Sequence, residues 1–231
     1  MRQFKIAVGN NLKNKIGELG FFLEKIIELS KVIEQRDLKR DYPLNEELDK
    51  LNFFFSAYLN TIQSLKDAFK AATGANFSWK DISPTYGNFV YFCRNATTHD
   101  GSHLINAGKE GRSYIAGPLR RIDNHKKVIT FDPPNEDVFS LCCNLTDEIL
   151  QSLTNLLKRE GENILVLADG DFNDAIQTVL ASDFMPNEVK GLIQSNIDGI
   201  EASFKGIKVD IVHQTIKAIA NVARIVEDSL T

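Results

Sequence analysis

Cysteine is scarce in this sequence. Only three cysteines, Cys93, Cys142 and Cys143, occur among 231 residues, and no two of them have the Cys-x-x-Cys spacing of a metal or redox site. This scarcity excludes a disulfide-rich scaffold. We expect three reduced and mostly buried thiols.

Long apolar runs are also missing. No stretch approaches the roughly 20 consecutive apolar residues that a membrane helix needs. Residues 1–5 lack the apolar run that is typical of a signal peptide. We therefore expect a cytoplasmic protein with no membrane partner.

The sequence has no excess of positive charge. Its formal net charge of −4 argues against a protein that coats nucleic acid with its whole surface, so any such affinity must come from a local patch. Hydrophobic residues make up 43% and charged residues 25% of the chain, which is typical of a folded protein rather than a disordered one.

What the sequence does contain is helical periodicity. Apolar residues spaced three and four apart predict long helices over residues 10–37, 44–72 and 135–160. Gly74 stands where the second of these should stop. The link between the first two is short and contains a proline, which predicts an antiparallel helical hairpin.

A shorter helix is predicted between the second and the last of these. Ser83 and Pro84 suit a helix start, since serine can cap the first turn and proline fits within it. The helix should run to about residue 98, with Gly101 as its stop signal.

The pattern then changes from helical to extended. Residues 113–122 and 126–131 are predicted to be strands, with Asp123 and Asn124 as a turn signal between them. We expect one β-hairpin, inserted at about residues 112–132.

The last third of the chain returns to a helical pattern, in pieces near residues 171–182, 186–197 and 209–229. We expect a helical bundle with its hairpin over residues 1–161 and a C-terminal helical region over 162–231, whose packing on the bundle stays open. The predicted fold class is all-α: an up-and-down helical bundle with an inserted β-hairpin and additional C-terminal helices.

The residue types that carry chemistry gather at the end of the predicted helix near residue 98. Arg94, Asn95 and His99 lie within six residues. Asn95 and His99 are four apart and share a helical face, whereas Arg94 lies about 140° from His99 around an ideal helix. Arg94 and His99 can converge if the long arginine reaches, if the helix loosens, or across a dimer.

These residue types suit phosphodiester chemistry without a metal. An imidazole can deprotonate a ribose 2′-hydroxyl or protonate a leaving oxygen near neutral pH. A guanidinium binds phosphate with two parallel hydrogen bonds, and an amide can orient either partner. The plain alternative is a helix C-terminus stabilised by two cations, since both favour the negative end of the helix dipole.

The spacing of Arg94, Asn95 and His99 resembles the Arg–x(4–6)–His motif of the HEPN superfamily, and the order of helices extends the resemblance to about residues 10–160. The resemblance implies a dimeric helical bundle in which two motifs meet and cleave RNA to a 2′,3′-cyclic phosphate, with no cofactor. It implies that His99 is the general acid/base, that Arg94 binds the scissile phosphate and that Asn95 orients them. Active members occur in toxin–antitoxin systems, which adds an antitoxin protein to the candidate partners.

Two further features bear on RNA binding and assembly. The candidate RNA contacts are Arg112, Arg120, Arg121, His125, Lys126 and Lys127 in the hairpin, and His103 before it. The basic residues have an equally weighted alternative role, the protection of an exposed sheet edge. Tyr91 and Phe92 share the helical face of Asn95 and His99, away from the core face, so we expect a second subunit to cover them in a homodimer.

Two other interpretations remain open. One is a non-catalytic HEPN-like module that binds nucleotide, RNA or a protein partner. The other is a purely structural interaction protein, which would have no basic groove. His99 and His103 are four apart, but neither the His-Glu-x-x-His pattern nor a cysteine cluster accompanies them, so we expect no metal site.

Overall fold

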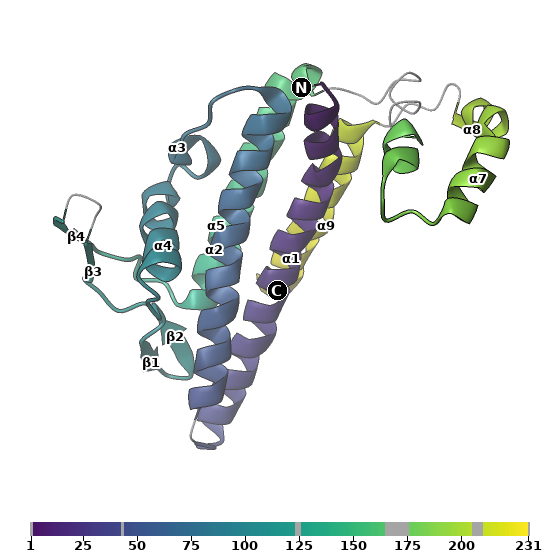
Figure 1. Ribbon diagram of the computed structural model, residues 1–231. Helices are drawn as coiled ribbons and strands as arrows, with labels where there is room; N and C mark the ends of the chain where they lie inside the picture. The colour runs from purple at the N-terminus through teal and green to yellow at the C-terminus, as the bar shows by residue number, and fades with distance from the viewer. Residues whose placement is uncertain (1, 43, 123–125, 165–175, 205–209, 231) are drawn as a thin grey trace.

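The computed structural model describes residues 2–42, 44–122, 126–164, 176–204 and 210–230, and it is predominantly helical (Figure 1). Its longest elements are α1 (Arg2–Leu38) and α2 (Asn45–Thr73), which pack against each other as the predicted antiparallel hairpin. α2 ends at Gly74, whose φ of 76° is left-handed and whose N–H donates to the Lys70 carbonyl over 2.8 Å. Glycine is the residue that adopts this conformation most readily, so the predicted stop signal is confirmed.

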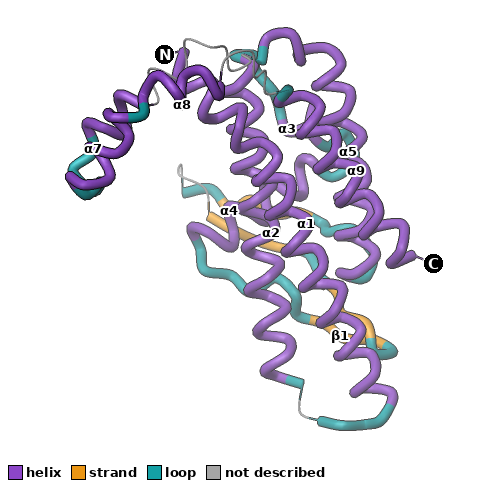
Figure 2. Tube along the Cα trace, turned by 90° about the vertical axis from the view of Figure 1, so that its right-hand side faces the viewer, coloured by secondary structure: helices purple, strands orange, loops and turns teal. Residues whose placement is uncertain are grey.

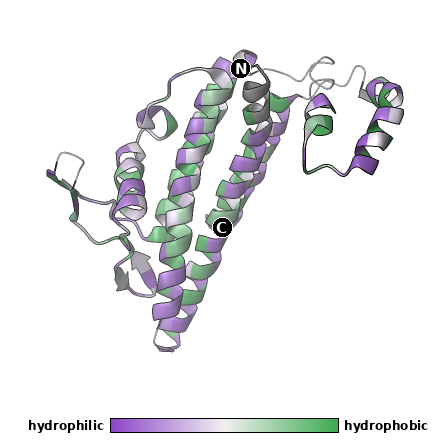
Figure 3. Ribbon diagram, in the orientation of Figure 1, coloured by the Kyte–Doolittle hydropathy of each residue, from purple (hydrophilic) through white to green (hydrophobic). Residues whose placement is uncertain are grey.

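Two further long helices complete the bundle. α5 (Val138–Glu160) begins at Asp137, whose side chain accepts a hydrogen bond from the Ser140 N–H. α9 (Ile211–Leu230) returns to pack on α1 and α5, so the end of the chain belongs to the same bundle. Apolar and polar residues alternate along the long helices, as expected for helices with one buried face (Figure 3).

The core between these helices is mostly apolar, and the phenol hydroxyl buried within it is hydrogen-bonded. Tyr58 is fully buried, and its hydroxyl donates to the Cys142 carbonyl over 3.2 Å and shares a 2.8 Å hydrogen bond with Thr146 Oγ1. All three cysteines are buried and reduced, as predicted. Burial raises the pKa of each thiol, that of Cys143 to about 11, so none is poised as a nucleophile.

Two short helices connect α2 to the strands. α3 (Trp79–Ile82) begins at Ser78, whose side chain and backbone form a capping box with Asp81. α4 (Gly87–His99) starts three residues later than Pro84 predicts, because residues 84–86 form a turn. At Gly87 a Cβ would lie 2.5 Å from the Trp79 carbonyl oxygen, so glycine permits the close contact between α3 and α4.

The extended region forms two small sheets rather than the single predicted hairpin. β1 (Ala107–Lys109) pairs with β2 (Arg112–Tyr114), and β3 (Leu119–Ile122) pairs with β4 (Val128–Phe131), both antiparallel. The predicted strand at 113–122 is thus divided, because Pro118 has no N–H to continue a ladder. The predicted turn at Asp123 and Asn124 lies outside the described residues.

Residues 176–204 form an arm at one end of the bundle. Residues 176–181 are helical, followed by α7 (Asn187–Ser195) and α8 (Ile197–Phe204), and the arm projects from the bundle in both views (Figures 1 and 2). Before the arm, α5 passes into a short 3-10 helix (Gly161–Asn163), so α5 itself ends where Gly161 predicts. Buried Ile164 and Ile211 both lie beside Gly9, within 3.5 Å of where its Cβ would be. The chain therefore leaves the bundle and rejoins it at one place.

No helix in the described part of the chain is both long enough and apolar enough to cross a membrane.

Candidate functional site

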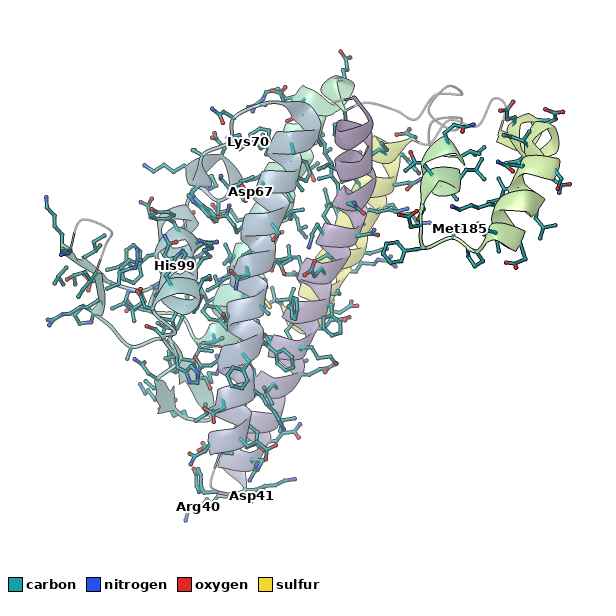
Figure 4. The ribbon with its side chains drawn as sticks, viewed as in Figure 1. Arg40, Asp41, Asp67, Lys70, His99 and Met185 are labelled. Atoms are coloured by element: carbon teal, nitrogen blue, oxygen red, sulfur yellow. The ribbon has the colours of Figure 1, made fainter. Side chains whose placement is uncertain are left out.

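The candidate site lies at the C-terminal end of α4, where one arginine reaches both of its predicted partners. Arg94 Nη1 lies 3.1 Å from Asn95 Oδ1 and 3.3 Å from His99 Nε2. The three side chains that the sequence singled out therefore converge within one chain, because the arginine spans the angle between the two helical faces. His99 is exposed at the end of α4, on the side of the molecule that carries the β-hairpins (Figure 4).

The contact between Arg94 and His99 assigns a tautomer to the neutral imidazole. A guanidinium has only donors, so Nε2 accepts the hydrogen bond and the ring proton is assigned to Nδ1. In this arrangement the Nε2 lone pair is directed at Arg94. The imidazole can take a proton through Nε2 only when Arg94 turns to another acceptor, such as a phosphate oxygen.

Arg94 also retains donor capacity. Its Nε is buried and has no hydrogen-bond partner within the described part of the chain. A buried donor left unpaired costs about 1–3 kcal/mol. An anion placed against the guanidinium would reach its outer N–H groups and neutralise the charge.

The end of α4 is held in place from two sides. Its core face is buried as predicted, with Phe89, Val90, Cys93 and Ala96 each at most 2% exposed. On α2, Asn60 Oδ1 accepts a hydrogen bond from Thr98 Oγ1 over 3.0 Å. Gly101, with a φ of 64°, ends the helix as predicted.

The expectation for Phe92 is wrong. Phe92 is only 5% exposed, and its ring stacks on Phe131 of β4 with 5.3 Å between the ring centroids. The β3–β4 hairpin of the same chain therefore covers this side chain. Tyr91 is 54% exposed, with its ring 6.3 Å from that of Trp79, so of the two aromatic residues only Tyr91 remains open to a second subunit.

The β3–β4 hairpin is also joined to α4 by an ion pair. Arg121 Nε donates to Asp100 Oδ2 over 3.1 Å, and only 9% of the Arg121 side chain is exposed. Arg121, a predicted RNA contact, is thus paired and mostly buried, and it positions the hairpin. Arg120, Lys126 and Lys127 are exposed on the hairpin that packs beside the site, and His125 lies outside the described residues.

Two of the predicted RNA contacts lie elsewhere. Arg112 Nη1 donates to Asp137 Oδ2 over 3.1 Å at the start of α5. His103 packs its ring edge against Phe53, with Nδ1 3.8 Å from Asp49 Oδ1 on α2. The 11 residues from Asp49 to Asn60 span about 17 Å of helix, so His103 is well separated from His99.

Sequence reasoning missed the groups that anchor the site. Asn52 is buried on α2, and its side chain accepts from the Ile105 N–H and donates to the Ile105 carbonyl, each over 3.0 Å. This pair of bonds fixes the segment that follows His99. Asn52, Asn60 and Asp100 are ordinary polar residues by sequence, and nothing in their spacing marked them.

Within the described ranges, no three His, Cys, Asp or Glu side chains are grouped as a metal ion would require. No protein-family model, no curated protein and no solved structure matches the chain.

Proposed function

We propose that the protein is a metal-independent endoribonuclease of the HEPN type. The observation that carries this proposal is the contact of Arg94 Nη1 with both Asn95 Oδ1 and His99 Nε2 at an exposed helix end. RNA can be cleaved by attack of its own ribose 2′-hydroxyl on the neighbouring phosphate. This reaction can use an arginine, an amide and an imidazole that lie within hydrogen-bond reach of one another.

In the proposed reaction, an RNA phosphate takes the place of His99 as a hydrogen-bond partner of Arg94. His99 Nε2 is then released and can accept the proton of the ribose 2′-hydroxyl. The 2′-oxygen attacks phosphorus, the bond from phosphorus to the 5′-oxygen breaks, and protonated His99 returns its proton to that oxygen. The products are a 2′,3′-cyclic phosphate and a 5′-hydroxyl. Arg94 offsets the charge that builds on the phosphorane.

The surroundings suit a polyanionic substrate. Arg120, Lys126 and Lys127 are exposed on the hairpin that Phe131 and Arg121 hold against α4. Their charge favours the approach of phosphates by screened attraction. A homodimer belongs to the proposal, with exposed Tyr91 at or near its interface and a second motif beside the first.

A second candidate function is binding without cleavage. The observation that favours it is again the Arg94–His99 hydrogen bond, since it occupies the lone pair that a general base needs. A site that keeps this bond when RNA is present would bind phosphate and leave the RNA intact.

One experiment separates the two functions. Purified protein is incubated with single-stranded RNA in EDTA, and both cleavage and binding are measured. We expect cleavage, and we expect His99→Ala to reduce its rate by about 10²–10⁴-fold, the usual loss on removing a general acid or base. Arg94→Lys should also lose cleavage, because an ammonium group cannot make the two parallel hydrogen bonds of a planar guanidinium.

His103→Ala is the matched control, because His103 is another exposed histidine of the same surface region and lies far along α2 from the site. It should cleave like the parent. Equal cleavage by His99→Ala and His103→Ala, or loss of cleavage in EDTA, would show the mechanism to be wrong. Binding by all variants with no cleavage by any of them would favour the second function.

A further inference from the structure

The arm of residues 176–204 carries apolar side chains that its own chain leaves uncovered. Phe184 is 99% exposed and Leu192 64% exposed. α7 has no buried residue, although Val189, Leu192 and Ile193 recur on one helical face. Met185, labelled on the arm in Figure 4, lies clear of the long helices. An amphipathic segment of this kind normally packs its apolar face against another surface.

The arm is also acidic. Residues 176–204 contain four carboxylates and one lysine: Asp183, Glu188, Asp198, Glu201 and Lys190. A surface that receives the arm should therefore be apolar at its centre and positively charged around it.

A groove between α1 and α9 has this character. Gly20 lets α9 approach closely, since a Cβ there would lie 2.8 Å from Val222 Cγ2. One turn earlier, nothing lies within 4 Å of the position of a Gly17 Cβ, and a hollow of about 480 Å³ opens between the helices. Its apolar lining includes Phe21, which is 50% exposed, and Ile225.

The charges and length of the groove match the arm. Its lining contains two lysines, Lys13 and Lys217, and one carboxylate, that of Glu24, so the groove has a net positive charge. From Lys13 to Glu24 the groove follows about 17 Å of α1, and the nine residues of α7 span about 13 Å. α7 therefore fits along it by length. α7 itself carries one glutamate and one lysine, so the negative charge that faces the groove comes from Asp183, Asp198 and Glu201 on either side of α7.

We propose that this groove binds the arm of a second copy of the chain, so that two copies exchange arms. The arm of the same chain does not fill the groove, since no arm residue lines it and Phe184 and Leu192 stay exposed. A second copy supplies an identical acidic amphipathic arm, and a two-fold axis makes the exchange reciprocal, which doubles the buried surface. α4 packs on α2 and α9 packs on α1, so this interface is separate from the one proposed near Tyr91, and a chain that uses both forms assemblies larger than a dimer. Cross-links between the arm and the groove report on this interface alone and are independent of the proposed RNase activity.

Cross-linking between two single-cysteine variants tests the exchange. Isotope-labelled Gly17→Cys chain is mixed with unlabelled Leu192→Cys chain, treated with a short bismaleimide, and analysed by mass spectrometry. The native thiols are buried, so the parent chain serves as the blank. We expect cross-links that join a labelled chain to an unlabelled one.

Gln194→Cys is the matched control, because residue 194 is exposed on α7 and lies two positions, about 200°, around the helix from Leu192. It should cross-link to Gly17→Cys much less. Equal yields for the two arm positions, or no cross-link between chains, would overturn the proposal. So would a chain carrying both Gly17→Cys and Leu192→Cys that cross-links only within itself.

Charge reversal provides a second measurement. Lys13→Glu with Lys217→Glu should raise the dimer dissociation constant about tenfold in sedimentation experiments at low salt, the effect of losing two surface ion pairs. Lys39→Glu, at the far end of α1, is the control and should leave it unchanged. A parent chain that sediments as a monomer at micromolar concentration would overturn the exchange.

Discussion

Replacing Asn52 with leucine should destabilise the protein more than almost any other single polar substitution in the bundle. The Asn52 amide makes two 3.0 Å hydrogen bonds to the backbone of Ile105, and both residues are buried. Leucine has the same branched framework of heavy atoms, although it is larger, and it leaves the Ile105 N–H and carbonyl without partners. Removing each bond to a buried backbone group costs about 1–2 kcal/mol, which gives about 3 kcal/mol in total.

The assay is thermal unfolding followed by circular dichroism. For a chain of this size, 1 kcal/mol corresponds to about 2–4 °C, so the Tm should fall by about 6–12 °C. Asn88→Leu makes the same chemical change at an exposed position of α4 and should shift the Tm by less than about 2 °C. If the two variants unfold at the same temperature, the two Asn52–Ile105 bonds do not anchor this segment.

Three other features of the molecule can be tested by substitution. Replacing Arg120, Lys126 and Lys127 with serine should weaken RNA binding and reduce the log–log salt slope by roughly 0.7 for each phosphate that is no longer neutralised, whereas an unchanged slope with aggregation would favour edge protection. Gly87→Ala should destabilise the fold, measurable by urea unfolding, because its Cβ would meet the Trp79 backbone at 2.5 Å; unchanged stability would mean that α3 and α4 can separate. Burial and then Glu136 raise the pKa of Tyr86 from 10.0 to about 12, so the stability from its neutral hydroxyl is present below pH 10 and disappears towards pH 12. Tyr86→Phe should reduce this alkaline loss of stability, and an identical pH profile would refute the assignment.

The long helices were predictable because each has one continuous apolar face. The expected second helix at 44–72 differs from α2 by one residue at each end. Its end was predictable because Gly74 readily adopts the left-handed backbone that stops a helix. The sheets were less predictable. β1 is only three residues long, Ala107–Lys109, with no alternation, so its pairing with β2 had no signal in the sequence.

The candidate site was predictable only in its local part. The reach of Arg94 to His99 within one chain is one of the three arrangements that helical geometry and side-chain length left open. The cover over Phe92 and the partner of Arg121 depend on how a hairpin folds back over α4. Asp100 and Arg121 are 21 residues apart, and a charge type alone cannot show whether a side chain is solvated or paired.

Ile164 and Ile211 lie together beside Gly9, so the segment between them leaves the bundle and returns to it at the same point. For a flexible loop with fixed ends, the entropic cost of closure rises only with the logarithm of its length, by about 0.6 kcal/mol for each doubling. Changes of chain length between Ile164 and Ile211 should therefore cost the four packed helices little. We expect insertions and deletions to be tolerated there outside the arm helices, while the bundle keeps its register.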